Sequence, residues 1–456
     1  MNKENKELFE TLSVKKAVWT LAIPTMLGMI VMVLYNLADT FFIGQTGDSS
    51  QVAAVSLGMP VFLLLMAFGN LFGIGGSTSI SRNLGEGKTE KAKNISSFSC
   101  WSAFGTGVLV GALMLIFMPQ ITRLVGASPT TEAFVSQYLI YIAIGAPFII
   151  LSNTFGNIVR SEGAAKKAMV GMMIGTIINI VLDPIMILWM DMGVTGAAIA
   201  TILGNIASTI YYIAYFRSGK THLSISLKHW NAGNGIAKDV LAIGIPGAVG
   251  NILMSVTNVI YNNYLISYGD APVAAMGVAI KATMMLAMIL IGLTQGTQPL
   301  FGYSYGAKNY HRFKASTKYC MKISIIIGIV ITVVYQFGAA SIIKAFINDT
   351  EVIEYGTKML RILMTTGPVL GITFVVMSAM QAMGKAGMSL LLSVCRQGLA
   401  FIPAVIFANM LFGLDGLMWA QPVADAVSIV LSLILFIVVM KKLPQNASPD
   451  AIVVNE

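Results

Sequence analysis

Apolar residues occur in this chain as long runs separated by short polar loops. The runs predict helices at 16–44, 52–80, 94–118, 132–155, 165–190 and 194–216, and again at 238–267, 274–303, 317–344, 352–381, 388–411 and 416–440. A helix of about 20 residues crosses a hydrocarbon core of roughly 30 Å, so each run is long enough to span a membrane. The runs lack the alternation of barrel strands and the one-sided spacing of a surface helix. The sequence therefore predicts an all-α membrane protein with twelve transmembrane helices.

The second half of the chain repeats the landmarks of the first half at a nearly constant offset. Pro24, Gly75 and Gly193 correspond to Pro246, Gly296 and Gly413, and the offset changes by only one position from each pair to the next. Because each half has six helices, both halves enter the membrane from the same side. Repeats of this kind are related by an axis along the membrane normal, and they usually transport by rocking around a site near the mid-membrane. This arrangement favours a transporter.

From the repeat we expect two pseudo-symmetric six-helix lobes around a central cleft. The N-lobe is predicted at 1–217, a cytoplasmic linker at 218–237, and the C-lobe with a short cytoplasmic tail at 238–456. The internal duplication also favours a monomer as the functional unit.

Charged residues are few and unevenly placed. They make up 11% of the chain, against roughly 25% in soluble domains, while 56% of the residues are hydrophobic. Alternate loops are basic, for example Arg82, Lys88, Lys91 and Lys93 in one and Lys308, Arg312 and Lys314 in another, whereas the opposite loops carry Asp48, Asp191, Asp270, Asp349 and Asp415. By the positive-inside rule, both termini are cytoplasmic. The net charge of +9 is thus a topology signal, which favours a multi-pass protein of the plasma membrane and argues against nucleic-acid binding.

The sequence carries no signal for catalysis or for a cofactor. Cys100, Cys320 and Cys395 lie in or beside apolar runs without metal-ligand spacing, which favours simple packing. There is no P-loop, so ATP-driven transport is not expected, and the three histidines fall in predicted cytoplasmic loops. The charged N-terminus precedes no cleavable signal peptide, so the first membrane helix is expected to serve as a retained signal.

Ionisable and polar groups inside membrane helices are costly, so each is a candidate functional residue. The clearest set belongs to the first half: Tyr35, Asn36 and Asp39 on the first helix, Asn179 and Asp183 on the fifth, and Thr201 and Asn205 on the sixth. Residues three or four positions apart share a helix face. The helix directions place the three sets in the outer half of the membrane, so two carboxylates, an amide and a hydroxyl are expected at comparable depth.

This set has the chemistry of a cation or proton site. Hard oxygen ligands suit Na⁺, for which Asp39, Asn179, Asp183 and Thr201 are the candidate ligands. Alternatively, two close carboxylates in a low dielectric cannot both ionise cheaply, so one of them becomes a proton carrier. Either arrangement lets an ion gradient drive transport. A purely structural interpretation has Asp39 near a helix end as a cap and Asp183 bonded to the backbone kinked at Pro184.

The repeat provides an internal control for this prediction. At the offsets of the neighbouring landmarks, Asp39 corresponds to Tyr261 and Asp183 to Ala404, so the second half keeps the scaffold without these carboxylates. Packing needs common to both halves do not explain that asymmetry, which favours a function confined to the first half. Pro24 shares the first helix with Asp39, and we expect it to be a hinge that couples ion binding to motion.

The second half has polar positions whose roles the sequence leaves open. Asp425 either forms a structural pair with Arg396 or lines the cleft. Lys281 lies about two turns from the outer end of its helix, where it lines the cleft or snorkels outward. Gln295 and Gln298 either line the cleft or hydrogen-bond between helices.

The sequence resembles the multidrug and toxic compound extrusion (MATE) transporters over essentially its full length, and it looks closest to their MepA-like branch. The resemblance is carried by LAIPTMLGMIVMVLYNLADTFFIG, SISRNLGEGKTEKA, NIVLDPIMI, GVTGAAIATILGN and FGYSYGAKNYHRF, in this order. It implies two six-helix lobes and efflux of cationic amphiphilic compounds driven by Na⁺ or H⁺. It also implies that Asp39, Asn179, Asp183 and Thr201 correspond to the N-lobe cation or proton site of the family, and that the region of Pro24 corresponds to its bent first helix.

One departure from the family pattern concerns the second half. Members of the NorM type carry acidic residues in helices 7 and 10, whereas SVTNVIYNNYL and LMTTGPVLGITFVVMSAM hold no carboxylate here. A C-lobe ion site of that type is therefore not expected, unless Asp425 takes its place. A lipid-linked oligosaccharide flippase or a metabolite exporter of the same superfamily is the alternative function, but a flippase for a pyrophosphate-linked lipid is expected to need more basic residues in the cleft.

Overall fold

The computed structural model describes residues 3–347 and 349–444, and all regular secondary structure in these ranges is helical. In the first half the helices are α1 (Lys3–Glu10), α2 (Val14–Gly44), α3 (Ser49–Gly85), α4 (Thr89–Ile116), α5 (Met118–Leu124), α6 (Glu132–Ser161), α7 (Ala165–Asp183), the π-helix η1 (Pro184–Trp189) and α8 (Gly193–Arg217). In the second half they are the 3-10 turn η2 (Leu227–His229), α9 (Ile236–Ile266), α10 (Asp270–Gly306), α11 (Tyr310–Phe346), α12 (Thr350–Leu363), the 3-10 turn η3 (Met364–Thr366), α13 (Gly367–Ala382), α14 (Ala386–Val394), the π-helix η4 (Cys395–Leu399) and α15 (Phe401–Lys442).

Twelve segments of these helices are long enough to cross a membrane, as the sequence predicts. Eleven helical stretches are sufficiently long and apolar, and the last of them, Ala386–Lys442, has 57 residues. A straight helix of that length would measure about 85 Å, almost three times the hydrocarbon core. The chain instead turns back at Gly413, whose φ of 58° and ψ of −134° are not helical. The stretch therefore crosses twice, before and after Gly413.

Several helices extend beyond the apolar runs that predicted them. The helix α11 begins at Tyr310 rather than at 317, and α3 continues to Gly85 rather than to 80. The added turns are polar or basic, so hydropathy locates only the part of each helix that lies in hydrocarbon. The short helices α1 and α5 were not predicted, because neither is a long apolar run.

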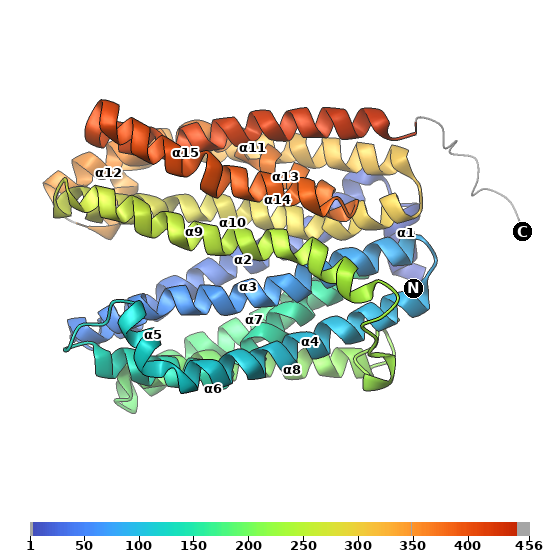
Figure 1. Ribbon diagram of the computed structural model, residues 1–456, viewed down its shortest axis with the longest axis horizontal. Helices are drawn as coiled ribbons and strands as arrows, with labels where there is room; N and C mark the ends of the chain where they lie inside the picture. The colour runs from blue at the N-terminus through green and yellow to red at the C-terminus, as the bar shows by residue number, and fades with distance from the viewer. Residues whose placement is uncertain (1–2, 348, 445–456) are drawn as a thin grey trace, which may run out of the picture.

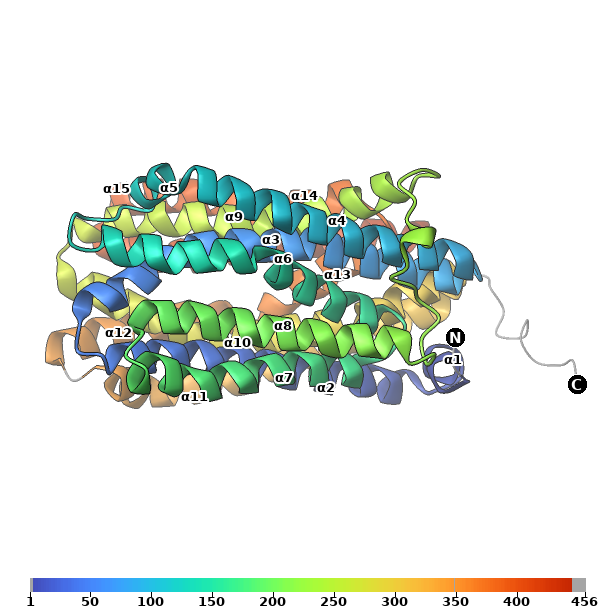
Figure 2. The same ribbon diagram turned by 90° about the horizontal axis from the view of Figure 1, so that it is seen from below.

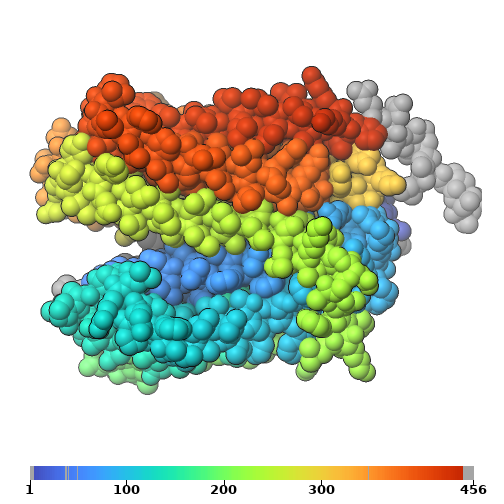
Figure 3. Space-filling view, in the orientation of Figure 1, coloured from blue at the N-terminus to red at the C-terminus, as the bar shows by residue number. Residues whose placement is uncertain are grey.

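The helices form two bundles that lie side by side (Figures 1 and 2). The N-lobe contains α2 to α8, and the C-lobe contains α9 to α15. The lobes are joined where α2 packs against α10 and where α3 packs against α9 and α10. Figure 3 shows a cleft between the lobes that is open at the end of α5 and α12 and closed at the end that holds the 218–235 segment. These two ends are called the open end and the closed end below.

Glycines bring the lobes together at the closed end. A Cβ on Gly85 of α3 would collide with the carbonyl oxygen of Tyr303, and one on Gly306 of α10 would collide with that of Arg82. Gly85 and Gly306 are equivalent positions in the repeat, as are Arg82 and Tyr303, so this contact lies on the pseudo-twofold axis. An ion pair between Arg82 of the N-lobe and Asp239 of the C-lobe, with a distance of 3.4 Å, adds to the same contact.

The helix α1 lies across the closed end and contacts both lobes. Phe9 is 1% exposed and stacks on Tyr303 of the C-lobe, with 4.8 Å between ring centroids. The same phenyl ring lies against Gly163, between α6 and α7 of the N-lobe. Arg312 Nη2 donates to the carbonyl oxygen of Leu8 at 3.0 Å, and Tyr303 donates from its hydroxyl to Glu10 at 2.6 Å. Thus α1 ties the lobes together on the side where the cleft is closed.

Candidate functional site

The fifth membrane helix changes its winding at the candidate site. The α-helix α7 ends at Asp183, and Pro184 begins the π-helix η1. Proline has no backbone N–H and cannot continue the regular ladder, so a widened turn is accommodated here. Asn179 and Asp183, four residues apart, lie on one face of α7 and are 3% and 0% exposed. A carboxylate therefore sits inside the N-lobe next to an irregular turn.

The side-chain amide of Asn179 connects this carboxylate to α8. The amide nitrogen of Asn179 donates to Asp183 Oδ2 at 3.2 Å, and its amide oxygen accepts from the backbone N–H of Thr201 at 3.0 Å. With the opposite amide orientation, the nitrogen would lie 3.4 Å from both Asp183 Oδ1 and Thr201 Oγ1. The first orientation is favoured because its contacts are shorter and because each amide atom meets a complementary partner.

Further hydrogen bonds extend the network to α2 and α6. The hydroxyls of Tyr35 and Thr201 are 3.3 Å apart, which links α2 to α8. Asn205 donates to the carbonyl oxygen of Thr201 at 2.8 Å and accepts from the hydroxyl of Ser152 on α6 at 2.6 Å. The structure thus brings together residues that the sequence placed at similar depth on three helices, and it adds a fourth helix. Below, this set of residues, together with Asp39, is called the N-lobe network.

Asp39 completes the network from α2. Its Oδ1 is buried and has no hydrogen-bond partner among the described residues. Asp39 is close enough to Asp183, Tyr35 and Tyr138 for its charge to act on each of them. No lysine, arginine or histidine in the described part of the chain lies within 4.0 Å of either carboxylate. Two acidic groups, on α2 and α7, are therefore within electrostatic range of one another without a basic side chain within 4.0 Å to compensate them.

This arrangement can bind a proton or a small cation. A buried carboxylate without a counter-charge is costly, so an ion or a proton from solution lowers the energy of the network. The available ligands are carboxylate, amide and hydroxyl oxygens, which suit hard cations rather than transition metals. No group of three or more His, Cys, Asp or Glu residues that would suit a metal ion occurs in the described ranges.

The remaining predicted residues of the N-lobe have different outcomes. The side chain of Asn36 lies outside the residues that the structure describes. Pro24 lies inside α2, which is an uninterrupted helix from Val14 to Gly44, so a hinge at Pro24 stays a prediction. Ser152 was not predicted, because a serine in a helix usually bonds its own backbone. Ser152 does this too, since its hydroxyl is 3.1 Å from the carbonyl oxygen of Ile149.

In the C-lobe, the structure shows hydrogen-bond partners for Gln298 and for Asp425, and leaves the alternatives for Gln295 and Lys281 as predictions. Gln298 of α10 donates to Gln381 of α13 at 2.8 Å and is 4% exposed, so it bonds between helices. Gln295 is half-buried and Lys281 is exposed. Arg396 Nε donates to Asp425 Oδ1 at 2.8 Å, so the pairing alternative for Asp425 is the one that the structure shows.

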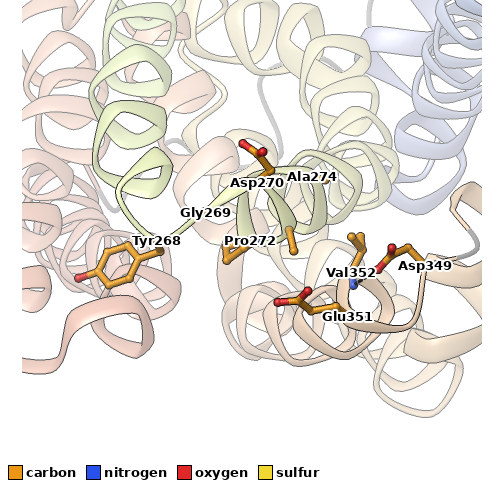
Figure 4. A pocket seen from close by; sticks show the side chains of 9 residues that line it. Tyr268, Gly269, Asp270, Pro272, Ala274, Asp349, Glu351 and Val352 are labelled. Carbon is orange, nitrogen blue, oxygen red and sulfur yellow. Dashed lines mark hydrogen bonds between the residues drawn. The ribbon is translucent and has the colours of Figure 1, made fainter.

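A separate pocket of about 450 Å³ lies at the open end of the C-lobe (Figure 4). It is lined by Tyr268, by the first turn of α10 and by the start of α12. Its acidic groups do not converge, because Asp270 lies on the far side of Pro272 from Glu351 (Figure 4). Asp349 is already used as the cap of α12, where it accepts from the N–H of Val352 at 3.0 Å. The pocket therefore lacks the converging polar groups that the N-lobe network has.

The chain matches a known family model and is similar to known proteins over nearly its full length. The family model named MatE matches residues 24–185 and again 246–406, so the two matched segments begin at the equivalent prolines Pro24 and Pro246. A multidrug export protein MepA from Staphylococcus saprophyticus is 33% identical, and the alignment covers 94% of each chain. The MepA of Staphylococcus aureus strain MSSA476 is 32% identical over 98% of this chain and 99% of the relative.

Solved structures show the same architecture. One is described as the outward-facing conformation of a multidrug resistance MATE family transporter of the MOP superfamily. It has a TM-score of 0.93 and 26% sequence identity, and the match covers 98% of this chain and 100% of that one. A MOP superfamily transporter from Pyrococcus furiosus, described as having a binding pocket of reverse polarity, matches equally well, with a TM-score of 0.93 at 26% identity.

Proposed function

The chain belongs to the MATE family of multidrug export transporters, and from this premise we propose that it exports cationic amphiphilic compounds in exchange for Na⁺ or H⁺ bound at the N-lobe network. The observation that carries the proposal is that the fully buried Asp183 and the partly buried Asp39 lie in one network with amide and hydroxyl groups, and that no basic side chain in the described part of the chain lies within 4.0 Å of either carboxylate. Such a pair changes its energy when a cation or a proton arrives, so occupancy can favour one arrangement of the helices over another.

The orientation of the chain in the membrane follows from the charge of its two ends. The closed end carries the basic loops, including Lys88, Lys91 and Lys93, so it is the cytoplasmic side by the positive-inside rule. The cleft of this structure then opens to the outside (Figure 3). In this state an external ion reaches the N-lobe network, and its binding prepares the return to a state that is open to the cytoplasm and to a new substrate. Both termini are cytoplasmic in this scheme, the membrane is the plasma membrane, and the chain works as a monomer.

Coupling requires that the ion and the substrate favour different conformations of the transporter, so that their binding is not independent. The network joins α2, α6, α7 and α8. Its occupancy can therefore alter the packing of α2, which also contacts α10 of the C-lobe. A ligand shifts a two-state equilibrium only by its difference in affinity for the states. Tyr35 and Asp39 place part of the ion site on the helix that contributes to the lobe interface.

The test is ethidium efflux from proteoliposomes under a Na⁺ gradient or a pH gradient, each imposed alone. Wild type is expected to respond to one gradient, which identifies the ion. Asp39→Asn and Asp183→Asn are each expected to lose at least about tenfold of the gradient-driven rate, because each removes one charge from the pair. Asp270→Asn, at an exposed open-end position, is the matched control and keeps the wild-type rate.

Each contrary result has a distinct meaning. Equal gradient-driven efflux by wild type and Asp183→Asn would reject the N-lobe network as the coupling site. Failure of both gradients to move ethidium would reject the proposed substrate class and favour the metabolite exporter or flippase alternative. The N-lobe network itself favours cations, because its two charged groups are carboxylates.

A further inference from the structure

The C-lobe has a polar cluster on helices that correspond to those of the N-lobe network. Asp425 and Gln421 of α15 correspond to Asn205 and Thr201 of α8 at the same offset that relates Gly413 to Gly193. The other members come from the helices equivalent to α7 and α6. Arg396 lies in η4, which follows α14, and Thr366 lies in η3, which precedes α13. The two clusters therefore lie on equivalent helices of the repeat, and they share equivalent positions on α8 and α15, whereas Arg396 and Thr366 correspond to Gly175 and Gly145.

The clusters differ in how their negative charge is balanced. The N-lobe network holds two carboxylates that no described basic side chain approaches within 4.0 Å. The C-lobe cluster holds one carboxylate, Asp425, and Arg396 Nε lies 2.8 Å from its Oδ1. The counterpart of Asp39 is Tyr261, whose hydroxyl donates to the carbonyl oxygen of Leu417 at 3.0 Å. The N-lobe network therefore depends on a cation from solution, whereas the C-lobe cluster is neutral by itself.

Arg396 is held in the manner of a bound cation. Its guanidinium carbon lies 5.1 Å from the ring centroid of Phe374, within the range of a cation–π contact. Asp425 also accepts from Gln421 at 3.0 Å and from Thr366 at 3.5 Å. The side chains of Arg396 and Asp425 are only 18% and 5% exposed. Without the guanidinium, this site would offer a buried carboxylate together with amide and hydroxyl oxygens, which is the ligand chemistry of the N-lobe network.

We infer that Arg396 is a built-in cation that occupies the C-lobe counterpart of the N-lobe ion site, and that removing its charge creates a second site for a monovalent cation or a proton at Asp425. The inference deepens the proposed function and rests on its assignment of the N-lobe network as an ion site. It explains why one chain with two similar lobes couples through one of them. Arg396 is a positioning residue in this scheme, since it keeps an ion out of the C-lobe and touches no substrate.

The test measures thermal unfolding of purified protein and needs no transport. Asp39→Asn/Asp183→Asn is the parent, because it removes the ion response of the N-lobe. Arg396→Gln in this parent is expected to gain stability, by roughly 2 °C or more in melting temperature, when NaCl replaces choline chloride or when the pH is lowered in choline chloride. The first response identifies Na⁺ as the new occupant and the second identifies H⁺. The parent alone is expected to show neither response.

Two matched variants separate this effect from simple loss of packing. Arg396→Gln/Asp425→Asn removes both charges and is expected to lose the ion and pH responses, while Arg396→Lys retains a cation and is expected to behave like the parent. Ion and pH responses that are absent in Arg396→Gln, or that persist unchanged in the double variant, overturn the inference. If Arg396→Gln accumulates poorly, the yield of folded protein in size-exclusion chromatography is compared between extracts made in NaCl, in choline chloride and at lower pH. An equal yield in all three, with rescue only by Asp425→Asn, also overturns it.

The outcome is independent of the transport assay. A protein that fails to export ethidium but gains an ion response in Arg396→Gln contradicts the proposed substrate while the C-lobe inference stands. A protein whose efflux depends on Asp183 but whose Arg396→Gln variant ignores both ions supports the proposed function and overturns the inference.

Discussion

At the scale of single residues, Thr201 contacts members of the N-lobe network on two other helices and on its own helix. Its backbone N–H donates to Asn179, its carbonyl oxygen accepts from Asn205, and its hydroxyl lies 3.3 Å from that of Tyr35. Only the hydroxyl depends on the side chain. The two backbone contacts hold α8 in register with α7, and the hydroxyl is the group that faces α2.

Thr201→Val removes this hydroxyl and keeps the side-chain shape. We expect the apparent affinity for the coupling ion to fall about fivefold, which corresponds to roughly 1 kcal/mol for one hydrogen-bonding group. The measurement is the ion concentration at half-maximal efflux in proteoliposomes. Thr209→Val is a matched control on the same helix, because the buried hydroxyl of Thr209 has no partner among the described residues. An equal loss in both variants would mean that the effect comes from α8 packing rather than from the network.

Glu162 is a buried acid outside the membrane-spanning helices, in the turn between α6 and α7. It is 2% exposed and accepts from Tyr215 and Thr221 at 2.8 Å each, and from the N–H of His222 at 3.4 Å. Burial raises the pKa of Glu162 above its ordinary value of 4.5, although the three donors oppose that rise. Its contacts hold Thr221 and His222, at the start of the segment between the two lobes, against the N-lobe.

The raised pKa of Glu162 predicts a pH dependence of stability with a definite sign. The folded state holds the proton more tightly than the unfolded state, so this contribution is fully present below pH 4.5 and is lost as the pH rises through the folded-state pKa. Glu162→Gln cannot lose a proton, so its melting temperature is expected to fall less steeply than that of wild type as the pH rises above 4.5. Glu132→Gln, at an exposed position, serves as the control. A Glu162→Gln curve parallel to that of wild type would contradict the prediction.

At the scale of secondary-structure elements, α1 is the helix whose role is least visible in hydropathy. It has 8 residues, and only Leu8 and Phe9 are buried among those whose side chains are described. Both side chains lie against Gly163 of the N-lobe, and the ring of Phe9 also stacks on Tyr303 of the C-lobe. The short amphipathic helix α1 thus contributes to the closed end by placing the ring of Phe9 between the two lobes.

Phe9→Ala is expected to weaken the closed end. Truncating a buried phenylalanine costs about 3 kcal/mol or more in a well-packed site, and here the lost contacts join two lobes. Spin labels on the closed-end loops of the two lobes are expected to show a longer distance distribution in Phe9→Ala than in wild type. Glu7→Ala on the exposed face of α1 is the control. Identical distributions in Phe9→Ala and wild type would show that α1 does not hold the lobes together.

At the scale of the whole molecule, the lobes meet at a contact that the repeat makes symmetric. Gly85 faces Tyr303 and Gly306 faces Arg82, so the positions that the repeat makes equivalent in sequence also form equivalent contacts in space. Each glycine permits backbone contact that a side chain would prevent. The closed end therefore depends on the absence of two methyl groups.

Gly306→Ala is expected to hold the lobes apart at the closed end and to shift the equilibrium away from the state described here. The added Cβ would collide with backbone rather than with a flexible side chain, so the strain is relieved mainly by separating the lobes. A cysteine introduced into the cleft is expected to be labelled more by a reagent added on the cytoplasmic side than in the protein without Gly306→Ala. Efflux is expected to fall. Gly277→Ala on the same helix is the control, since no atom lies within 4 Å of its added Cβ. Equal labelling of the two variants would contradict this role for Gly306.

The number of membrane crossings and the division into two similar halves follow from the sequence alone. The twelve crossings come from run length, because a fixed rise per residue converts residues into membrane thickness. The two halves come from the constant offset of landmarks such as Gly75 and Gly296. The same rise per residue predicts comparable depths for Asp183 and Thr201, and the structure joins both to Asn179. Their role in coupling stays a prediction.

Other features were decided only by the tertiary structure. The pairing of Arg396 with Asp425, the bond between Gln298 and Gln381, and the contact of Ser152 with the N-lobe network all depend on how each helix is rotated about its axis. In a membrane helix the buried face and the lipid-facing face are both apolar, so hydropathy does not fix that rotation. The opening of the cleft is set by the tilt of one lobe against the other, which depends on contacts between residues from opposite halves of the chain, such as Gly85 and Tyr303.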